Sequence, residues 1–237
     1  MDSNIMRLTE HITPSAGCFD VNDCLRPASV LDMLQDIAAK HAQKLGCGYE
    51  AMLKKHRLWV LLRTRYEVEL YPEFGRGLLI STWPQQGRLD FDRHYLLTGE
   101  DGTVFVRARS KWCVIDSDTR RLVKDTGVCY PAPCPEDIAL GPVTKPEIPA
   151  KGNDKGIFTA GLSDLDHNGH MNNARYADIV HNCLEPGDRL RAMSINYIHE
   201  LSVGQSMEIK SLRGDGAVTV WGQRGETVCF AALAELG

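Results

Sequence analysis

The chain has 237 residues, of which 43% are hydrophobic and 24% charged, and its formal net charge at pH 7 is −4. This composition fits one large globular domain or two small ones, and the slight negative charge without an arginine-rich tract argues against a nucleic-acid partner. The opening residues carry no apolar run long enough for a signal peptide or a membrane span, so we expect a cytoplasmic protein.

The cysteines and histidines do not form a recognisable metal-binding pattern. Eight cysteines are scattered without any Cys-x-x-Cys spacing, which predicts neither a zinc site nor a redox pair. The histidines that could in principle hold a metal are His167, His170, His181 and His199. They come without a His-Glu-x-x-His helix or a matching set of carboxylates. We therefore expect no metal and no other cofactor.

A short polar segment followed by an apolar helix opens the first half of the chain. The polar segment is Phe19–Cys24, and Pro27 stands where the first turn of a helix tolerates a proline. From Ala28 to Ala42, apolar residues recur at helical spacing. Strand-like runs then follow at 77–83, 93–98 and 104–115.

Six prolines lie between Tyr130 and Pro149. Proline cannot sit in the interior of a regular helix or in a central strand. We therefore predict a proline-rich linker over residues 131–155, which divides the chain into an N-terminal unit, 1–130, and a C-terminal unit, 156–237.

The second half opens with the densest polar segment of the chain, Leu165–Tyr176. Asp166, Asn168 and His170 alternate there, so an extended backbone would aim all three into one space. From Met171 onward the apolar spacing becomes helical, which places the trio where unpaired helix N–H groups suit a developing oxyanion. Asx-rich segments before helices are often only caps, but this one holds more polar groups than capping needs.

A weak internal repeat relates the two halves. Phe19–Cys24 aligns with Leu165–His170, with Asp and Asn in register and cysteine in place of the histidine, and an apolar helix follows each. Downstream, Arg65–Leu70 aligns with Asn196–Leu201, and both end in Glu-Leu on a predicted strand. The first copy carries extra residues around 45–56. Further strand-like runs in the second half lie at 206–212, 217–222 and 227–232.

This order of elements predicts an α+β fold. Each unit would be a long antiparallel sheet wrapped around one central helix, and the chain would hold two such units in tandem.

These residues resemble those of the acyl-[acyl carrier protein] thioesterases, which have two hotdog units in one polypeptide. Residues 163–176 are similar to the family's Ser-Asp-Leu-Asp-x-Asn-x-His-Val-Asn-Asn-x-x-Tyr, and Ala108–Trp112 followed by Asp118–Arg121 fits the first unit. The resemblance implies hydrolysis of fatty acyl-ACP to free fatty acid and ACP, which ends chain elongation in fatty-acid biosynthesis. Single-hotdog acyl-CoA thioesterases share part of the motif and are the alternative, and a non-catalytic acyl-binding or dehydratase-like hotdog protein is a third interpretation.

The resemblance implies a catalytic group of four residues in the second unit. They are Asp166, Asn168, His170 and Glu200. Many plant members carry a cysteine directly after the glutamate, whereas this chain has Leu201, which has no nucleophilic atom, so a carboxylate must drive the reaction. Either Glu200 acts as general base on water, or Asp166 attacks the carbonyl to form a mixed anhydride.

Because Cys24 replaces the histidine, we expect the first unit to have lost catalysis and to bind the acyl tail. The candidate substrate-binding residues are Leu34, Ala38, Trp59 and Leu61. The family's partner is an acidic carrier protein with a phosphopantetheine arm, which a local basic cluster could attract. The candidate docking residues are Lys54, Lys55, Arg57, Arg63 and Arg65. The preferred chain length, and whether the chain is a monomer or a homodimer, stay open.

Overall fold

The computed structural model describes residues 6–87, 89–130 and 139–237. The elements in chain order are β1 (Leu8–Ile12), η1 (Ala16–Cys18), α2 (Pro27–Lys44), α3 (Tyr49–Leu53), β2 (Arg57–Val68), β3 (Leu78–Gln86), β4 (Phe91–Thr98), β5 (Val104–Asp116), β6 (Asn153–Thr159), η3 (Leu162–Asp164), α4 (Arg175–His181), β7 (Leu190–Tyr197), β8 (Ser206–Gly214), β9 (Ala217–Arg224) and β10 (Thr227–Leu236). No helix in these described ranges is long and apolar enough to cross a membrane.

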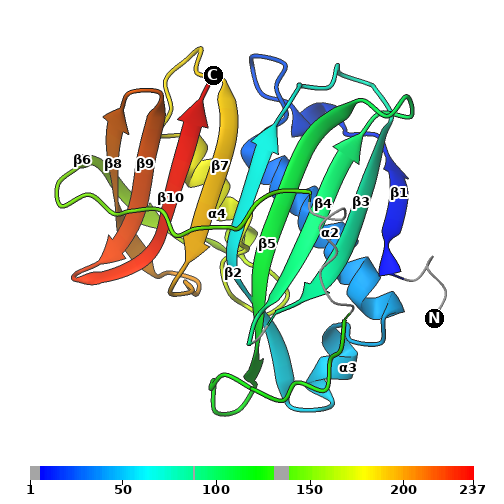
Figure 1. Ribbon diagram of the computed structural model, residues 1–237. Helices are drawn as coiled ribbons and strands as arrows, with labels where there is room; N and C mark the ends of the chain where they lie inside the picture. Colours follow the sequence, from blue (N-terminus) through cyan, green and yellow to red (C-terminus); the bar gives the residue numbers. More distant parts are fainter. Residues whose placement is uncertain (1–5, 88, 131–138) are drawn as a thin grey trace.

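All the strands belong to one 10-stranded sheet in the order β1-β3-β4-β5-β2-β7-β10-β9-β8-β6. The two halves meet where β2 pairs antiparallel with β7, from Arg63 opposite Asn196 to Glu67 opposite Ala192. Helices α2 and α4 lie on the same face of this sheet (Figure 1). The predicted α+β class, with a sheet and a central helix in each half, is confirmed.

Helix α2 forms because its apolar residues line one face. Pro27 occupies the first turn, and Leu31, Leu34 and Ile37 are each 3% exposed or less. Full burial of such a side chain contributes about 1.5–3 kcal/mol, so this face holds the helix on the sheet. Helix α4 is only seven residues long and begins at Arg175, four residues after Met171, where the helical apolar spacing starts.

The polar loop before the helix has the same conformation in both halves. Asp20 Oδ1 accepts hydrogen bonds from the backbone N–H groups of Asn22 (2.8 Å) and Cys24 (3.0 Å). Asp166 Oδ1 accepts them from Asn168 (2.8 Å) and His170 (3.4 Å). The repeat read from the sequence is thus a repeat of loop geometry.

Strand register corrects one pairing of the repeat. The N–H groups of Glu69 and Leu70 both donate to Phe105 O, and those of Ile198 and His199 both donate to Cys229 O. Glu69 therefore corresponds to Ile198, which leaves Tyr71 as the counterpart of Glu200. Neither glutamate lies on a strand, because β2 ends at Val68 and β7 at Tyr197. The alignment of the two Glu-Leu pairs was wrong by two residues.

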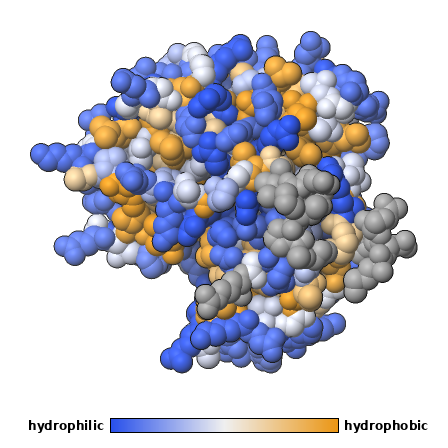
Figure 2. Space-filling model, viewed as in Figure 1, coloured by the Kyte–Doolittle hydropathy of each residue, from blue (hydrophilic) through white to orange (hydrophobic). Residues whose placement is uncertain are grey.

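The predicted linker lies partly outside the described residues, including Pro131, Pro133 and Pro135. Its described part, residues 139–152, forms neither helix nor strand, and β6 begins at Asn153, inside the predicted range. This segment crosses the sheet on the face away from the helices (Figure 1), where Ala139 and Val143 are buried. The same side of the molecule is largely hydrophilic, with scattered hydrophobic groups (Figure 2).

An ionic cluster bridges the two halves beside the β2–β7 pair. Arg65 Nη1 donates to Glu235 Oε1 (2.7 Å) and to Ser194 Oγ (3.0 Å), and Arg65 Nη2 donates to Glu67 Oε1 (2.7 Å). The hydrogen bond from Arg65 holds the pKa of Glu235 below its usual value. Because that pKa is lower in the folded protein than in the unfolded chain, the stabilisation is present above the unfolded pKa and is lost as the pH falls.

We expect Glu235→Gln to lower the free energy of unfolding by about 1 kcal/mol near neutral pH, and by progressively less below about pH 4. Urea unfolding of both proteins across this pH range measures the difference. Glu226→Gln, at the exposed β9–β10 turn, is the matched control and should have little effect. A pH-independent difference between Glu235→Gln and the parent would contradict the ionic contribution.

Candidate active site

Asp166, Asn168 and His170 lie together on the loop between η3 and α4. The Asp166 carboxylate accepts the two backbone N–H bonds described above through Oδ1, and it accepts Asn168 Nδ2 through Oδ2 at 3.2 Å. Both carboxylate oxygens of Asp166 are therefore engaged inside the loop. The side chain acts as the organiser of this segment, as Asp20 does in the first half.

Most backbone N–H groups of this loop are already bonded within the protein. Helix α4 begins only at Arg175, and every N–H from Asn168 to Asn172 donates to another group of the protein. Met171 N, for example, donates to Leu201 O at 2.7 Å. These N–H groups are therefore not free to hold an oxyanion, because the loop closes on Asp166 and on the segment after β7. Side-chain donors remain, including the second N–H of Asn168 Nδ2.

Glu200 lies beside His170, as the resemblance implies. Glu200 Oε2 is 3.4 Å from His170 Nδ1, and Glu200 is half-exposed at 47% of its side chain. A backbone bridge between His170 and Ser202 holds the two segments side by side. The neighbouring Leu201 is fully buried, so the position of the plant cysteine is part of the core here.

The N-terminal unit contributes groups that the site prediction missed. Arg120 Nη2 forms an ion pair with Glu200 Oε1, and Gln35 Nε2 of α2 donates to Asn172 Oδ1 at 3.2 Å. The ring of Tyr49 on α3 packs edge-on against the ring of His167, with 4.8 Å between the ring centroids. The only available sequence signal was the match of Asp118–Arg121 to the family.

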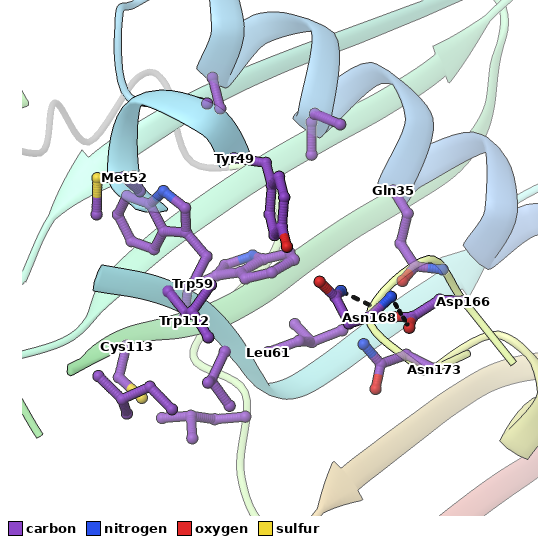
Figure 3. Close-up of a pocket in the computed structure, with 18 of the residues that line it drawn as sticks. Gln35, Tyr49, Met52, Trp59, Leu61, Trp112, Cys113, Asp166, Asn168 and Asn173 are labelled. Atoms are coloured by element: carbon purple, nitrogen blue, oxygen red, sulfur yellow. Dashed lines mark hydrogen bonds between the residues drawn. The ribbon is translucent and has the colours of Figure 1, made fainter. Parts of the chain in front are cut away.

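One cavity of about 1520 Å³ joins these groups to the interior of the N-terminal unit. Most of its lining comes from α2, α3, β2, β4 and β5, together with the loop 166–173 and the segment 197–200, and Arg120, Tyr130 and Tyr176 also contribute. Figure 3 shows Asp166 and Asn168 at one end, and Met52, Trp59, Trp112 and Cys113 towards the other. The polar group and the apolar wall therefore belong to one continuous space.

The predicted substrate-binding residues separate into two groups. Ala38, Trp59 and Leu61 line the cavity. Leu34 does not: it is 2% exposed and packs in the core between α2 and the sheet. The helical spacing predicted its buried face correctly but could not distinguish the core from the cavity wall.

Some of the inner wall of the cavity is polar. Arg93 is 6% exposed, and its Nη1 lies 3.1 Å from His41 Nδ1 and 3.3 Å from Thr82 Oγ1. Tyr130 lies in the same wall, where burial raises the pKa of its hydroxyl. Both side chains keep their polar ends beside partners within the protein, so the apolar chain of a ligand would meet a fixed wall there.

The predicted basic cluster is not one surface. Lys54 and Lys55 are exposed and lie at the cavity mouth beside α3. Arg57 donates to Thr126 O, and Arg63 Nε donates to Asn196 Oδ1 at 2.8 Å. Arg65 is held in the ionic cluster between the halves. The three arginines are spread along strand β2, and each is hydrogen-bonded within the protein. Only the two lysines therefore remain as candidates for docking.

In the first half, the side chains around Asp20 differ from those around Asp166. His181 Nε2 lies 3.6 Å from Asp20 Oδ2, and Tyr71 Oη donates to Leu190 O at 2.6 Å. Cys24 is 4% exposed, and burial raises the pKa of its thiol. Asp20 is not among the residues that line the large cavity. Within the described ranges, no three His, Cys, Asp or Glu side chains are grouped so that they could hold a metal.

Known proteins share both halves of the sequence. Residues 12–126 match the acyl-ACP thioesterase N-terminal domain, and residues 150–228 match the acyl-ACP thioesterase C-terminal domain. The chain is 32% identical to oleoyl-acyl carrier protein thioesterase 1, chloroplastic, of Arabidopsis thaliana over 62% of this chain and 46% of that protein. It is 28% identical to the palmitoyl-acyl carrier protein thioesterase, chloroplastic, of the same plant over 78% and 49%. The chain spans about half the length of these curated relatives.

Solved structures share the whole architecture. An acyl-ACP thioesterase from Bacteroides thetaiotaomicron gives a TM-score of 0.88 at 22% identity and covers 100% of both chains. The 12:0-ACP thioesterase from Umbellularia californica gives 0.85 at 19% identity, over 98% of this chain and 97% of that one. At these identities the likeness concerns the fold alone. Since both domain models match in order along the chain, the protein belongs to the acyl-ACP thioesterase family.

Proposed function

We propose that the protein hydrolyses fatty acyl-ACP to free fatty acid and ACP. The observation that carries the proposal is the single cavity that connects the Asp166–His170 loop and Glu200 with the apolar wall of the N-terminal unit. Its volume of about 1520 Å³ exceeds the roughly 300–1,000 Å³ of most small-molecule sites, which suits an acyl chain together with a pantetheine arm. The matched relatives named as oleoyl- and palmitoyl-ACP thioesterases support this substrate class.

In the proposed mechanism, Glu200 is the general base. It takes a proton from water as the water oxygen bonds to the thioester carbon, and Asn168 Nδ2 donates to the developing oxyanion. His170 orients the water or the thioester beside Glu200. When the tetrahedral intermediate collapses, the C–S bond breaks and the pantetheine sulfur takes up the proton.

The alternative attack by Asp166 has less support. Both its oxygens accept hydrogen bonds from the loop, which reduces their availability as nucleophiles. Asp20 accepts the same two backbone hydrogen bonds in the first half, where a cysteine replaces the histidine. We therefore assign Asp166 the role of holding Asn168 and His170 in place.

We place the reaction in the cytoplasm, with the carrier protein as the partner. The described cysteines are all free thiols, which suits a reducing compartment. The assignment of the acyl chain to residues 1–130 and of catalysis to residues 156–237 is likewise part of the proposal. A matched pair of acyl-ACP and acyl-CoA substrates tests the carrier, and faster turnover of the CoA ester would contradict it.

Glu200→Gln should lower kcat by about 10²- to 10⁴-fold, because it removes the base while keeping the size of the side chain. Release of free fatty acid from acyl-ACP measures the effect. Asp20→Asn, at the equivalent loop of the first half, is the control and should keep near-normal turnover.

Near-normal kcat for folded Glu200→Gln would contradict the general-base role. A single turnover in ¹⁸O-labelled water gives a second check. Label found only in the fatty acid agrees with direct attack by water, whereas label in the Asp166 carboxylate would show attack by Asp166.

The lysines at the cavity mouth should increase the rate at which the acidic carrier protein binds. We expect the double change Lys54→Glu and Lys55→Glu to raise KM for acyl-ACP and to weaken its dependence on salt, with little change in kcat, because steering acts through screened long-range attraction. Lys155→Glu, on the distant edge strand β6, is the matched control. Equal KM values for the double variant and the control would place docking elsewhere.

A further inference from the structure

Glu200 has a separate partner for each oxygen of its carboxylate. Oε2 lies 3.4 Å from His170 Nδ1, within the C-terminal unit. Oε1 pairs with Nη2 of Arg120, which comes from the N-terminal unit. Glu200 itself stands beyond the end of β7 and is half-exposed, so no strand neighbour fixes its side chain.

The turn that carries Arg120 is braced on several sides. Asp116 Oδ1 accepts the backbone N–H of Asp118 (3.1 Å) and both the N–H and the hydroxyl of Thr119 (2.7 and 2.8 Å). His56 Nδ1 lies 2.9 Å from Asp118 Oδ2, and His56 O accepts Ser117 N at 3.0 Å. Such a turn can present a side chain at a fixed place.

Arg120 has a backbone conformation that is uncommon for a residue with a side chain. Its φ is 59°, in the left-handed region that favours glycine. Residues held in this region occur preferentially at functional sites, where surrounding contacts maintain them. Here the bond from Arg120 N to Asp116 O (2.9 Å) closes the turn, and the side chain reaches Glu200.

We infer that Arg120 is a positioning residue for hydrolysis: it holds Glu200 Oε1 so that Oε2 stays beside His170 and the attacking water. This inference rests on the proposed function. A guanidinium suits the task because it is planar, keeps its charge at all working pH values and does not exchange protons with the substrate. The reaction centre of the C-terminal unit is therefore completed by a residue of the N-terminal unit.

The test compares Arg120→Ala, Arg120→Lys and Arg121→Ala in the full chain, with kcat and KM measured on acyl-ACP. Misplacing a reacting group by about 1 Å can cost about 10²-fold, so we expect Arg120→Ala to lose about 10- to 100-fold in kcat with KM little changed. Arg120→Lys keeps the charge and should recover part of the loss. Arg121→Ala changes the adjacent exposed arginine and should behave like the parent.

Adding Arg120→Ala to Glu200→Gln separates positioning from a general loss of structure. If Arg120 acts through Glu200, the second change costs little further kcat, whereas a structural defect would lower it again. Unchanged kcat for Arg120→Ala, or a rise in KM alone, would overturn the inference, and the latter would indicate a contact with the acidic carrier or its phosphate.

A readout without turnover keeps this inference apart from the proposed function. The ¹⁵N chemical shifts of His170 at fixed pH should change in Arg120→Ala and stay in place in Arg121→Ala, because only the former releases Glu200. Absence of acyl-ACP hydrolysis by the parent protein would refute the function. Unchanged His170 shifts in Arg120→Ala would refute the positioning role.

Discussion

Backbone pairing between β2 and β7 joins the two halves of the molecule and sets the position of every group in the candidate site. It makes one sheet of two halves and places helices α2 and α4 on the same face. The polar loop of the second half consequently lies against α2 and α3 of the first, and one cavity runs between them. Without this pairing, Arg120 could not meet Glu200, nor Gln35 meet Asn172.

The two copies of the polar loop share one backbone conformation but have different side chains around it. An aspartate organises each loop, but the first ends in buried Cys24 and the second in half-exposed His170. Around Asp20 the space is filled by His181 and Tyr71, whereas Asp166 faces a large cavity. The aspartate thus holds the loop in both halves, and the two halves differ in the side chains around it.

Local patterns predicted the parts of this protein that depend on local physics. The apolar spacing gave α2, and the alternation in residues 165–170 gave the grouping of Asp166 with Asn168 and His170. Long-range placement was not accessible in the same way. The backbone hydrogen bonds at the end of β2 make Tyr71, not Glu69, the structural counterpart of Glu200. Arg63 and Arg65 are bonded to groups of the C-terminal half, so they do not belong to an exposed basic cluster. Likewise, Leu34 has the same helical pattern as Ala38 but faces the core.

In the function that we propose, the C-terminal unit holds the thioester while the N-terminal unit holds the acyl chain. A crystal structure with a non-hydrolysable acyl-pantetheine, in which an amide replaces the thioester, tests it most directly. We expect the carbonyl oxygen to lie within hydrogen-bond distance of Asn168 Nδ2, and the alkyl chain to lie against Ala38, Trp59 and Leu61. An alkyl chain lying beside α4, or outside the cavity, would contradict it.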